Sequence, residues 1–254
     1  MYLKIKHFVI YITIGFCFSC KNKATSLNEI KGTQIIINSS LTSSDTIEAF
    51  ITPYRARINE VLDSTLTYTP KTITKEDGAY NTTAGNLLAD IVLSMAGPVF
   101  ESRTTKTIDF VLLNHGGIRS IISKGKVNAR NAYEVMPFEN SIVIAELDGA
   151  SVMRLISYLI EERKPHPISG IQIVLAKNNE LHALHIQGKA FDKNRTYYIA
   201  TSDYLATGGD RMYFFKEALQ ITETDYLIRN AMIDYFKKVD TLSPKIDQRF
   251  YKLK

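Results

Sequence analysis

The sequence predicts an α+β fold with mixed sheets. Helical spacing and β-rich apolar runs alternate along the chain in the order helix, helix, strand, strand, helix, three strands, helix. This order is neither the strict βαβ alternation of parallel α/β proteins nor an all-β pattern. The composition of the 254 residues, 45% hydrophobic and 22% charged, is typical of a globular chain and not of a disordered one.

The N-terminus has the features of an export signal. Two lysines precede an almost unbroken apolar run from Phe8 to Phe18, which is shorter than the roughly 20 residues of a membrane span but suits a signal-peptide core. The run ends at Ser19 and Cys20, and a small residue before a cysteine resembles the bacterial lipoprotein signal. We therefore expect residues 1–19 to be removed and Cys20 to carry a lipid anchor. A plain secretory signal cleaved near Ser19 is the alternative.

These features place the protein in a bacterial cell envelope, anchored to a membrane by lipid and facing the periplasm or the cell surface. Residues 20–45, rich in Lys, Asn, Ser and Thr, are predicted to form a tether with a candidate short strand at 33–37. The folded domain is expected to cover 46–254.

Four segments show the three- and four-residue apolar spacing of amphipathic helices. They cover residues 47–62, 83–97, 151–162 and 225–238. In the first, Pro53 either kinks the helix or occupies its first turn behind a Thr52 cap. The second is expected to end near Gly97 and Pro98, and the fourth to follow a Thr224 cap.

Five compact runs rich in β-branched and aromatic residues predict strands. They cover residues 108–113, 142–147, 171–175, 184–187 and 197–201.

The first candidate binding segment, residues 114–119, directly follows a predicted strand. Gly116 and Gly117 permit a sharp turn and close approach of a ligand to main-chain N–H groups. Asn114 can donate and accept hydrogen bonds, and Arg119 offers a planar charged fork suited to phosphate or carboxylate. A tight turn with a surface arginine is the alternative.

The second candidate segment runs from the end of another predicted strand through Tyr204, the pair Gly208 and Gly209, and Asp210. An exposed aromatic ring can stack on a planar base, and a carboxylate can accept hydrogen bonds from a sugar diol. A turn in which Tyr204 covers the core is the alternative. Residues 137–140 form a weaker third signal, a turn that leads into a strand.

Together these segments resemble the C-terminal domain of the 5′-nucleotidase and UDP-sugar hydrolase family. The likeness runs in order from about residue 46 to 251. It rests on five motifs, which are Thr83–Asp90, Asn114–Arg119, Pro137–Asn140, Ser169–Ile171 and Gly208–Asp210. The resemblance implies a four-layer α/β/β/α fold with mixed sheets. It also implies that this domain corresponds to the half of such enzymes that recognises the substrate.

The resemblance also implies roles for single residues. Arg119 would face the phosphate, Asp210 would hold the ribose, Tyr204 would stack on the base, and Arg154 falls near a second arginine of the family. The substrate-binding residues expected on this basis are Asn114, Gly116, Gly117, Arg119, Asn140, Arg154, Tyr204, Gly208, Gly209 and Asp210.

One departure from the family pattern bears on the base. The family's first stacking aromatic lies shortly before Ser169, but residues 165–168 read Pro-His-Pro-Ile here. Either His166 substitutes for it, or the base is held on one face only.

Catalysis in the family belongs to an N-terminal metallophosphoesterase domain with a dinuclear metal site. The five histidines of this chain are scattered, and no metal-ligand motif precedes residue 46. His182 and His185 would fall on opposite faces of a strand. We therefore expect no cofactor in this chain and a divalent metal pair in a partner.

Three functions remain open. The chain is the nucleotide-recognition domain of a split 5′-nucleotidase-type hydrolase in nucleotide catabolism, completed by a separate exported metallophosphoesterase chain. Alternatively, it is a non-catalytic nucleotide-binding surface lipoprotein, or a scaffold whose pocket has decayed. Nucleic acid is not expected as a partner, because 31 basic and 26 acidic residues are too evenly mixed. Two cysteines also exclude a disulfide scaffold.

Overall fold

The computed structural model describes residues 5, 7–12 and 27–254, so most of the predicted signal peptide and the predicted lipid anchor Cys20 lie outside the described residues. The chain divides into two compact units, residues 1–50 and 51–254. Residues 27–44 of the predicted tether form no regular helix or strand, and the strand expected at 33–37 is wrong. Ile35, Ile36 and Ile37 are 75–87% exposed, so these apolar side chains gain no burial that would stabilise a strand.

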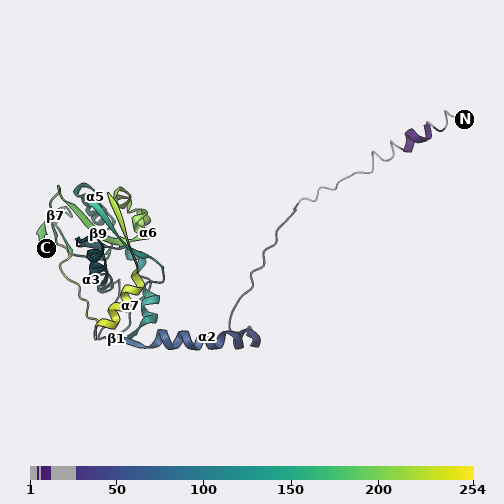
Figure 1. Cartoon of the computed structure of the whole chain (residues 1–254), viewed down its shortest axis with the longest axis horizontal. Helices are drawn as coiled ribbons and strands as arrows, with labels where there is room; N and C mark the ends of the chain where they lie inside the picture. Colours follow the sequence, from purple (N-terminus) through teal and green to yellow (C-terminus); the bar gives the residue numbers. More distant parts are fainter. Residues whose placement is uncertain (1–4, 6, 13–26) are drawn as a thin grey trace. The chain divides into compact units, whose positions relative to one another are not determined.

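The helices and strands follow the chain in a mixed order (Figure 1). The helices are α2 (Asp45–Asp63), α3 (Thr83–Thr104), α4 (Ala129–Val135), α5 (Gly149–Glu162), α6 (Asp203–Ala206) and α7 (Ile228–Lys238). The strands are β1 (Thr65–Thr69), β2 (Phe110–Leu112), β3 (Gly125–Asn128), β4 (Ser141–Asp148), β5 (Ile168–Ser169), β6 (Ile171–Leu175), β7 (Leu181–Ile186), β8 (Lys189–Ala190), β9 (Thr196–Ser202), β10 (Gln220–Leu227) and β11 (Phe250–Lys252). Short 3-10 turns are η1 (His115–Gly117), η2 (Gly209–Arg211) and η3 (Tyr213–Glu217).

Two mixed sheets form the framework, which confirms the predicted α+β fold with mixed sheets. The larger has the strand order β10-β4-β9-β2-β5, in which β2 and β9 run parallel and the other neighbours antiparallel. The smaller has the order β11-β6-β7-β8, with β11 and β6 parallel. Strands β1 and β3 pair separately.

Each face of the larger sheet packs into its own core. On one face, Ile91 and Val92 of α3 pack with Met232 of α7 and with sheet residues such as Val111. On the other face, apolar residues of α5 join the inner side of the smaller sheet. In Figure 1, β9 accordingly lies between α5 and α3.

Helix α3 begins where predicted but ends later. Thr82 caps it by accepting a hydrogen bond from the Gly85 amide. The helix continues through Pro98 to Thr104, so the predicted end near residue 97 is wrong. Phe100, two residues after Pro98, is 1% exposed and packs on Tyr198, and this burial offsets the hydrogen bond that a proline removes. Although α3 is long and apolar enough to cross a membrane, most of it is buried inside the fold.

The other helix boundaries also differ in places. Helix α7 begins at Ile228, and Thr224 lies in β10, where its hydroxyl donates to the Ile142 carbonyl. The Thr224 cap is therefore wrong, because the threonine is used in the sheet. In α2, Pro53 lies in the middle, which excludes the first-turn alternative.

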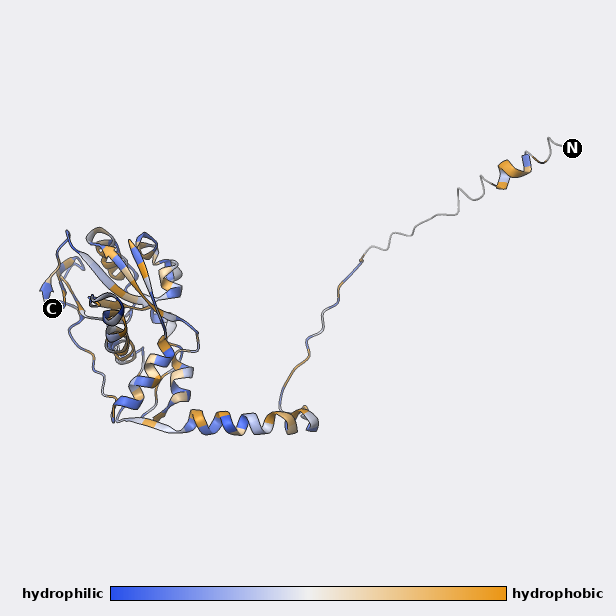
Figure 2. Ribbon diagram, viewed as in Figure 1, coloured by the Kyte–Doolittle hydropathy of each residue, from blue (hydrophilic) through white to orange (hydrophobic). Residues whose placement is uncertain are grey.

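Helix α2 carries hydrophilic and hydrophobic residues along its length, and none of them is buried (Figure 2). Its C-terminal turn is held by Arg130 of α4, which donates to Asp63 at 2.6 Å and to Asn59 at 2.9 Å.

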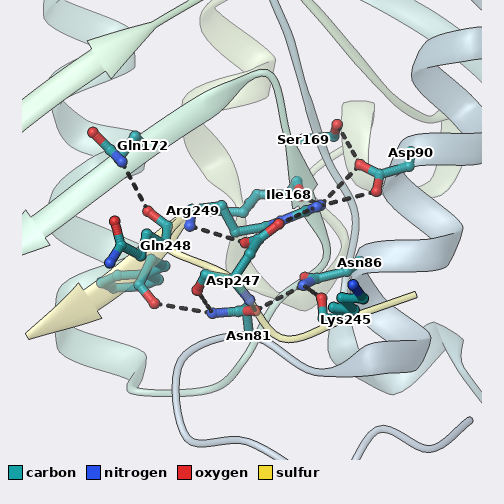
Figure 3. A network of polar contacts seen from close by, with 11 residues as sticks. Asn81, Asn86, Asp90, Ile168, Ser169, Gln172, Lys245, Asp247, Gln248 and Arg249 are labelled. Carbon is teal, nitrogen blue, oxygen red and sulfur yellow. Dashed lines mark hydrogen bonds and ion pairs between the residues drawn. The ribbon is translucent and has the colours of Figure 1, made fainter. Parts of the chain in front are cut away.

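A polar network fixes the C-terminal segment to the domain (Figure 3). The Arg249 guanidinium, 14% exposed, donates to both carboxylate oxygens of Asp90 on α3, at 2.9 and 3.1 Å, and to the Ile168 carbonyl at 2.7 Å. Asn81 donates to the main-chain carbonyls of Asp247 and Phe250. Strand β11 is therefore held beside β6 by charge-assisted hydrogen bonds as well as by apolar packing.

Candidate nucleotide-binding site

The two candidate segments meet because they follow parallel neighbouring strands. Strand β2 leads into residues 114–119, and β9 leads into α6 and residues 208–210. Parallel strands have their carboxyl ends at the same edge of a sheet. Residues 137–140 precede the antiparallel strand β4, whose Ile142 lies opposite Ser202 at the end of β9, so they reach the same edge.

A cavity of about 350 Å³ lies at this edge, within the size range of small-molecule sites. Its walls are formed by Asn114, Gly116, Gly117, Arg119, Phe138, Asn140, Tyr204 and Asp210. Seven of the ten residues expected from the sequence are therefore brought together around one cavity. Gly208, Gly209 and Arg154 are the three that do not line it.

The Asp210 carboxylate is held from two sides. Asn114 donates to Oδ2 at 2.7 Å, and the Tyr204 hydroxyl donates to Oδ1 at 3.0 Å. The main-chain carbonyl of Asp210 accepts from the Tyr158 hydroxyl at 2.9 Å. These contacts fix the carboxylate in the cavity wall, where each oxygen retains lone pairs for further donors.

The glycine pair gives Tyr204 and Asp210 their positions. A Cβ on Gly209 would lie 2.5 Å from the Tyr204 ring, so only glycine lets the ring approach this closely. Gly208 has φ +91°, and Asp210 itself has φ +51°, which is uncommon for a residue with a side chain. The chain thus turns sharply between the ring and the carboxylate.

Arg119 is exposed and forms part of the cavity wall, where its guanidinium donates to the Gly116 carbonyl at 3.4 Å. Its main-chain amide donates to the Val135 carbonyl at 2.9 Å, and its guanidinium lies 5.9 Å from the centre of the Phe138 ring. No acidic side chain among the described residues forms an ion pair with Arg119, so the cation is available to an anionic ligand.

Arg154 lies elsewhere. It is on α5, where its guanidinium donates to the Ser151 hydroxyl and pairs with Glu217. The charge of Arg154 is therefore met by a carboxylate outside the cavity wall.

His166 does not present its ring for stacking. The side chain is 4% exposed, its Nδ1 accepts from the His115 amide at 3.2 Å, and its ring packs on Tyr158 at 5.7 Å. Burial, and secondarily the neighbouring His115, lower the pKa of His166 from 6.5 to about 4, so the imidazole is neutral at pH 7. Burial, and to a lesser extent the negative charges of Glu162 and Asp210, raise the pKa of Tyr158 to about 12. The first of the two alternatives, in which His166 replaces the stacking aromatic, therefore does not agree with the geometry.

Phe138 is the cavity residue that sequence reasoning missed. It belongs to the weak turn signal 137–140, of which only Asn140 was expected at the site. Its side chain is 41% exposed, and the turn is fixed by a buried arginine, Arg229, distant in sequence. The local sequence gives no sign of this long-range contact.

The described residues contain no group of three or more His, Cys, Asp or Glu side chains that could hold a metal ion. His182, which is exposed, and His185 lie three residues apart on β7. The divalent metal pair that the family resemblance implies is expected in a partner chain, and that expectation stays a prediction.

Both the sequence and the fold identify the family to which this domain belongs. Residues 63–217 match the family model described as 5′-nucleotidase, C-terminal domain, and the chain belongs to this family. Protein UshA of Escherichia coli is 36% identical over 144 residues, which cover 54% of this chain and 26% of UshA. Cell wall protein Lmo0130 of Listeria monocytogenes is 26% identical over 209 residues, covering 73% of this chain and 26% of that protein.

Solved structures share the fold. The 5′-nucleotidase precursor from Thermus thermophilus superposes with a TM-score of 0.67 at 20% identity, covering 82% of this chain and 42% of that one. The NAD nucleotidase of Haemophilus influenzae gives a TM-score of 0.61 at 15% identity, covering 83% and 42%. The chain spans about a quarter of the length of the two curated relatives, UshA and Lmo0130.

Proposed function

We propose that this chain recognises the nucleoside part of a nucleotide for a 5′-nucleotidase-type hydrolase in nucleotide catabolism. The observation that carries the proposal is the Asp210 carboxylate, held by Asn114 and Tyr204 at the wall of a cavity that also contains the cation of Arg119. A ribose diol can donate to the carboxylate, the Tyr204 ring offers an apolar surface to the base, and Arg119 attracts the phosphate.

In this proposal the chain contributes positioning. Binding the nucleoside would hold the phosphate at a fixed place, so that attack on it becomes effectively intramolecular. The chemistry of water activation would come from a divalent metal pair bound by a separate, exported metallophosphoesterase chain.

The proposed location is the bacterial cell envelope, with Cys20 lipidated. It is supported by the signal-like N-terminus and by the likeness to a protein described as a cell wall protein. A lipid anchor would keep the recognition domain at the membrane without a membrane span.

A non-catalytic nucleotide-binding surface lipoprotein is the second candidate, and it is favoured because residues of this chain form the cavity by themselves. The experiment that separates the two is co-purification of the chain with exported metallophosphoesterases, followed by phosphate release from AMP with Mn²⁺ or Zn²⁺. We expect release by the mixture and none by this chain alone. Release by the pure chain at an enzyme-like rate would refute the division of labour. Nucleotide binding without activity in any mixture would favour the second candidate.

A further inference from the structure

The cavity contains two exposed aromatic side chains. Tyr204 is 45% exposed and Phe138 is 41% exposed, and both form part of its wall. Residues 165–168 contain no aromatic other than His166, which is buried. Among the residues that line the cavity, Phe138 is therefore the aromatic group, besides Tyr204, that a ligand can contact.

The main chain around Phe138 is fixed by one buried arginine. Arg229, 5% exposed, stands at the start of α7 and directs Nη1 at the carbonyl oxygens of Pro137 and Phe138, each at 3.3 Å. Its Nη2 donates to Glu139 at 3.1 Å. One guanidinium thus binds three consecutive residues of the turn.

The guanidinium is itself oriented by its surroundings. It lies 4.2 Å from the centre of the Tyr133 ring, at a distance typical of a cation–π contact. The adjacent Ile228 amide donates to the Asn140 carbonyl at 3.0 Å, which anchors the far end of the turn. A lysine has no planar fork that could replace these contacts.

We propose that Phe138 is the second aromatic contact for the base of the bound nucleoside, and that Arg229 is the positioning residue that holds Phe138 in the cavity wall. This inference rests on the proposed function. It accounts for base recognition in a chain whose residues 165–168 contain no Phe, Tyr or Trp. Because the ring is presented by a turn and not by the loop before β5, base preference here would depend on residues 137–140.

The test measures binding of adenosine and of ribose 5-phosphate, a probe without a base, to the full chain by calorimetry. Phe138→Leu keeps an apolar side chain and should weaken adenosine about tenfold while leaving ribose 5-phosphate unchanged, because stacking is lost. Phe138→Tyr should retain adenosine affinity. Tyr68→Leu is the matched control, since Tyr68 on β1 is 42% exposed and does not line the cavity.

Arg229 is tested by a double-mutant cycle. Arg229→Lys should weaken adenosine in the wild-type background and have no further effect in the Phe138→Leu background. Tyr133→Leu, which removes the ring under the guanidinium, should behave alike and serves if Arg229→Lys does not fold. Melting temperatures report folding separately.

The outcomes separate the two proposals. If the wild type binds adenosine and Phe138→Leu binds it equally well, this inference is wrong and the proposed function stands. Equal losses for adenosine and ribose 5-phosphate would likewise overturn it. If the effects of Arg229→Lys and Phe138→Leu simply add, Arg229 does not act through Phe138. A wild type that binds neither probe would overturn both proposals.

Discussion

The hydroxyl of Tyr204 donates to Oδ1 of Asp210 over 3.0 Å and accepts from the main-chain amide of Asp210 over 3.3 Å. The aromatic ring and the carboxylate are therefore one connected unit, not two independent side chains. Gly209 makes this possible, because it leaves room for the ring directly against the main chain. A change that displaces Tyr204 should consequently disturb the orientation of Asp210 as well.

Gly209→Ala should separate the ring from the carboxylate. The new Cβ would lie 2.5 Å from the Tyr204 ring, which must move. We expect the free energy of unfolding to fall by about 1–3 kcal/mol. The free energy of nucleoside binding should fall by a larger fraction of its wild-type value. Urea unfolding and calorimetric titration measure the two effects.

The control for this variant is Gly97→Ala in α3. A Cβ there meets no atom within 4 Å, and alanine favours a helix by up to about 1 kcal/mol over glycine. Gly97→Ala should leave binding unchanged and should not destabilise the fold. If Gly209→Ala behaves in the same way, the close packing of Tyr204 does not matter for the site.

Arg119→Gln should distinguish a nucleotide from a nucleoside. If the guanidinium binds the phosphate, its loss removes a charge-assisted hydrogen bond and should weaken AMP by about tenfold or more, with little effect on adenosine. Arg154→Gln is the matched control, because Arg154 pairs with Glu217 outside the cavity. Parallel losses of AMP and adenosine affinity in Arg119→Gln would assign Arg119 to another part of the ligand.

His166 should make stability fall in acid. Burial lowers the pKa of His166 from 6.5 to about 4, so between these pH values the unfolded chain binds a proton that the folded chain does not. The contribution of the neutral imidazole to the free energy of unfolding is fully present above pH 6.5. As the pH falls toward 4, this contribution is lost, and the free energy of unfolding decreases by about 3 kcal/mol. Urea midpoints measured from pH 7 to pH 4 should decline less steeply in His166→Phe than in the wild type.

His182→Phe, at an exposed position on β7, is the control for the general effect of replacing a histidine by phenylalanine. Identical slopes for His166→Phe and the wild type would show that the buried imidazole does not titrate as the geometry requires.

Much of the fold and the site could be predicted from local sequence patterns. The glycine pairs and the polar residues beside them mark the loops after β2 and β9, and strand adjacency then brings them together. Phe138 could not be assigned, because its exposure depends on Arg229, which is far away in the sequence. The helix cap predicted at Thr224 and the helix end predicted near Pro98 were wrong for a similar reason. In both cases sheet pairing or core packing, which a local pattern does not contain, decides where a helix begins or ends.

We propose above all that the cavity around Asp210 holds a nucleoside. Calorimetric titration of the wild type and of Asp210→Ala with adenosine tests it most directly. We predict binding by the wild type and a loss of about 1–3 kcal/mol in Asp210→Ala, since the ribose hydroxyls lose their acceptor. Equal affinity in both proteins, or no heat of binding in the wild type while its melting curve shows a folded domain, would contradict the claim.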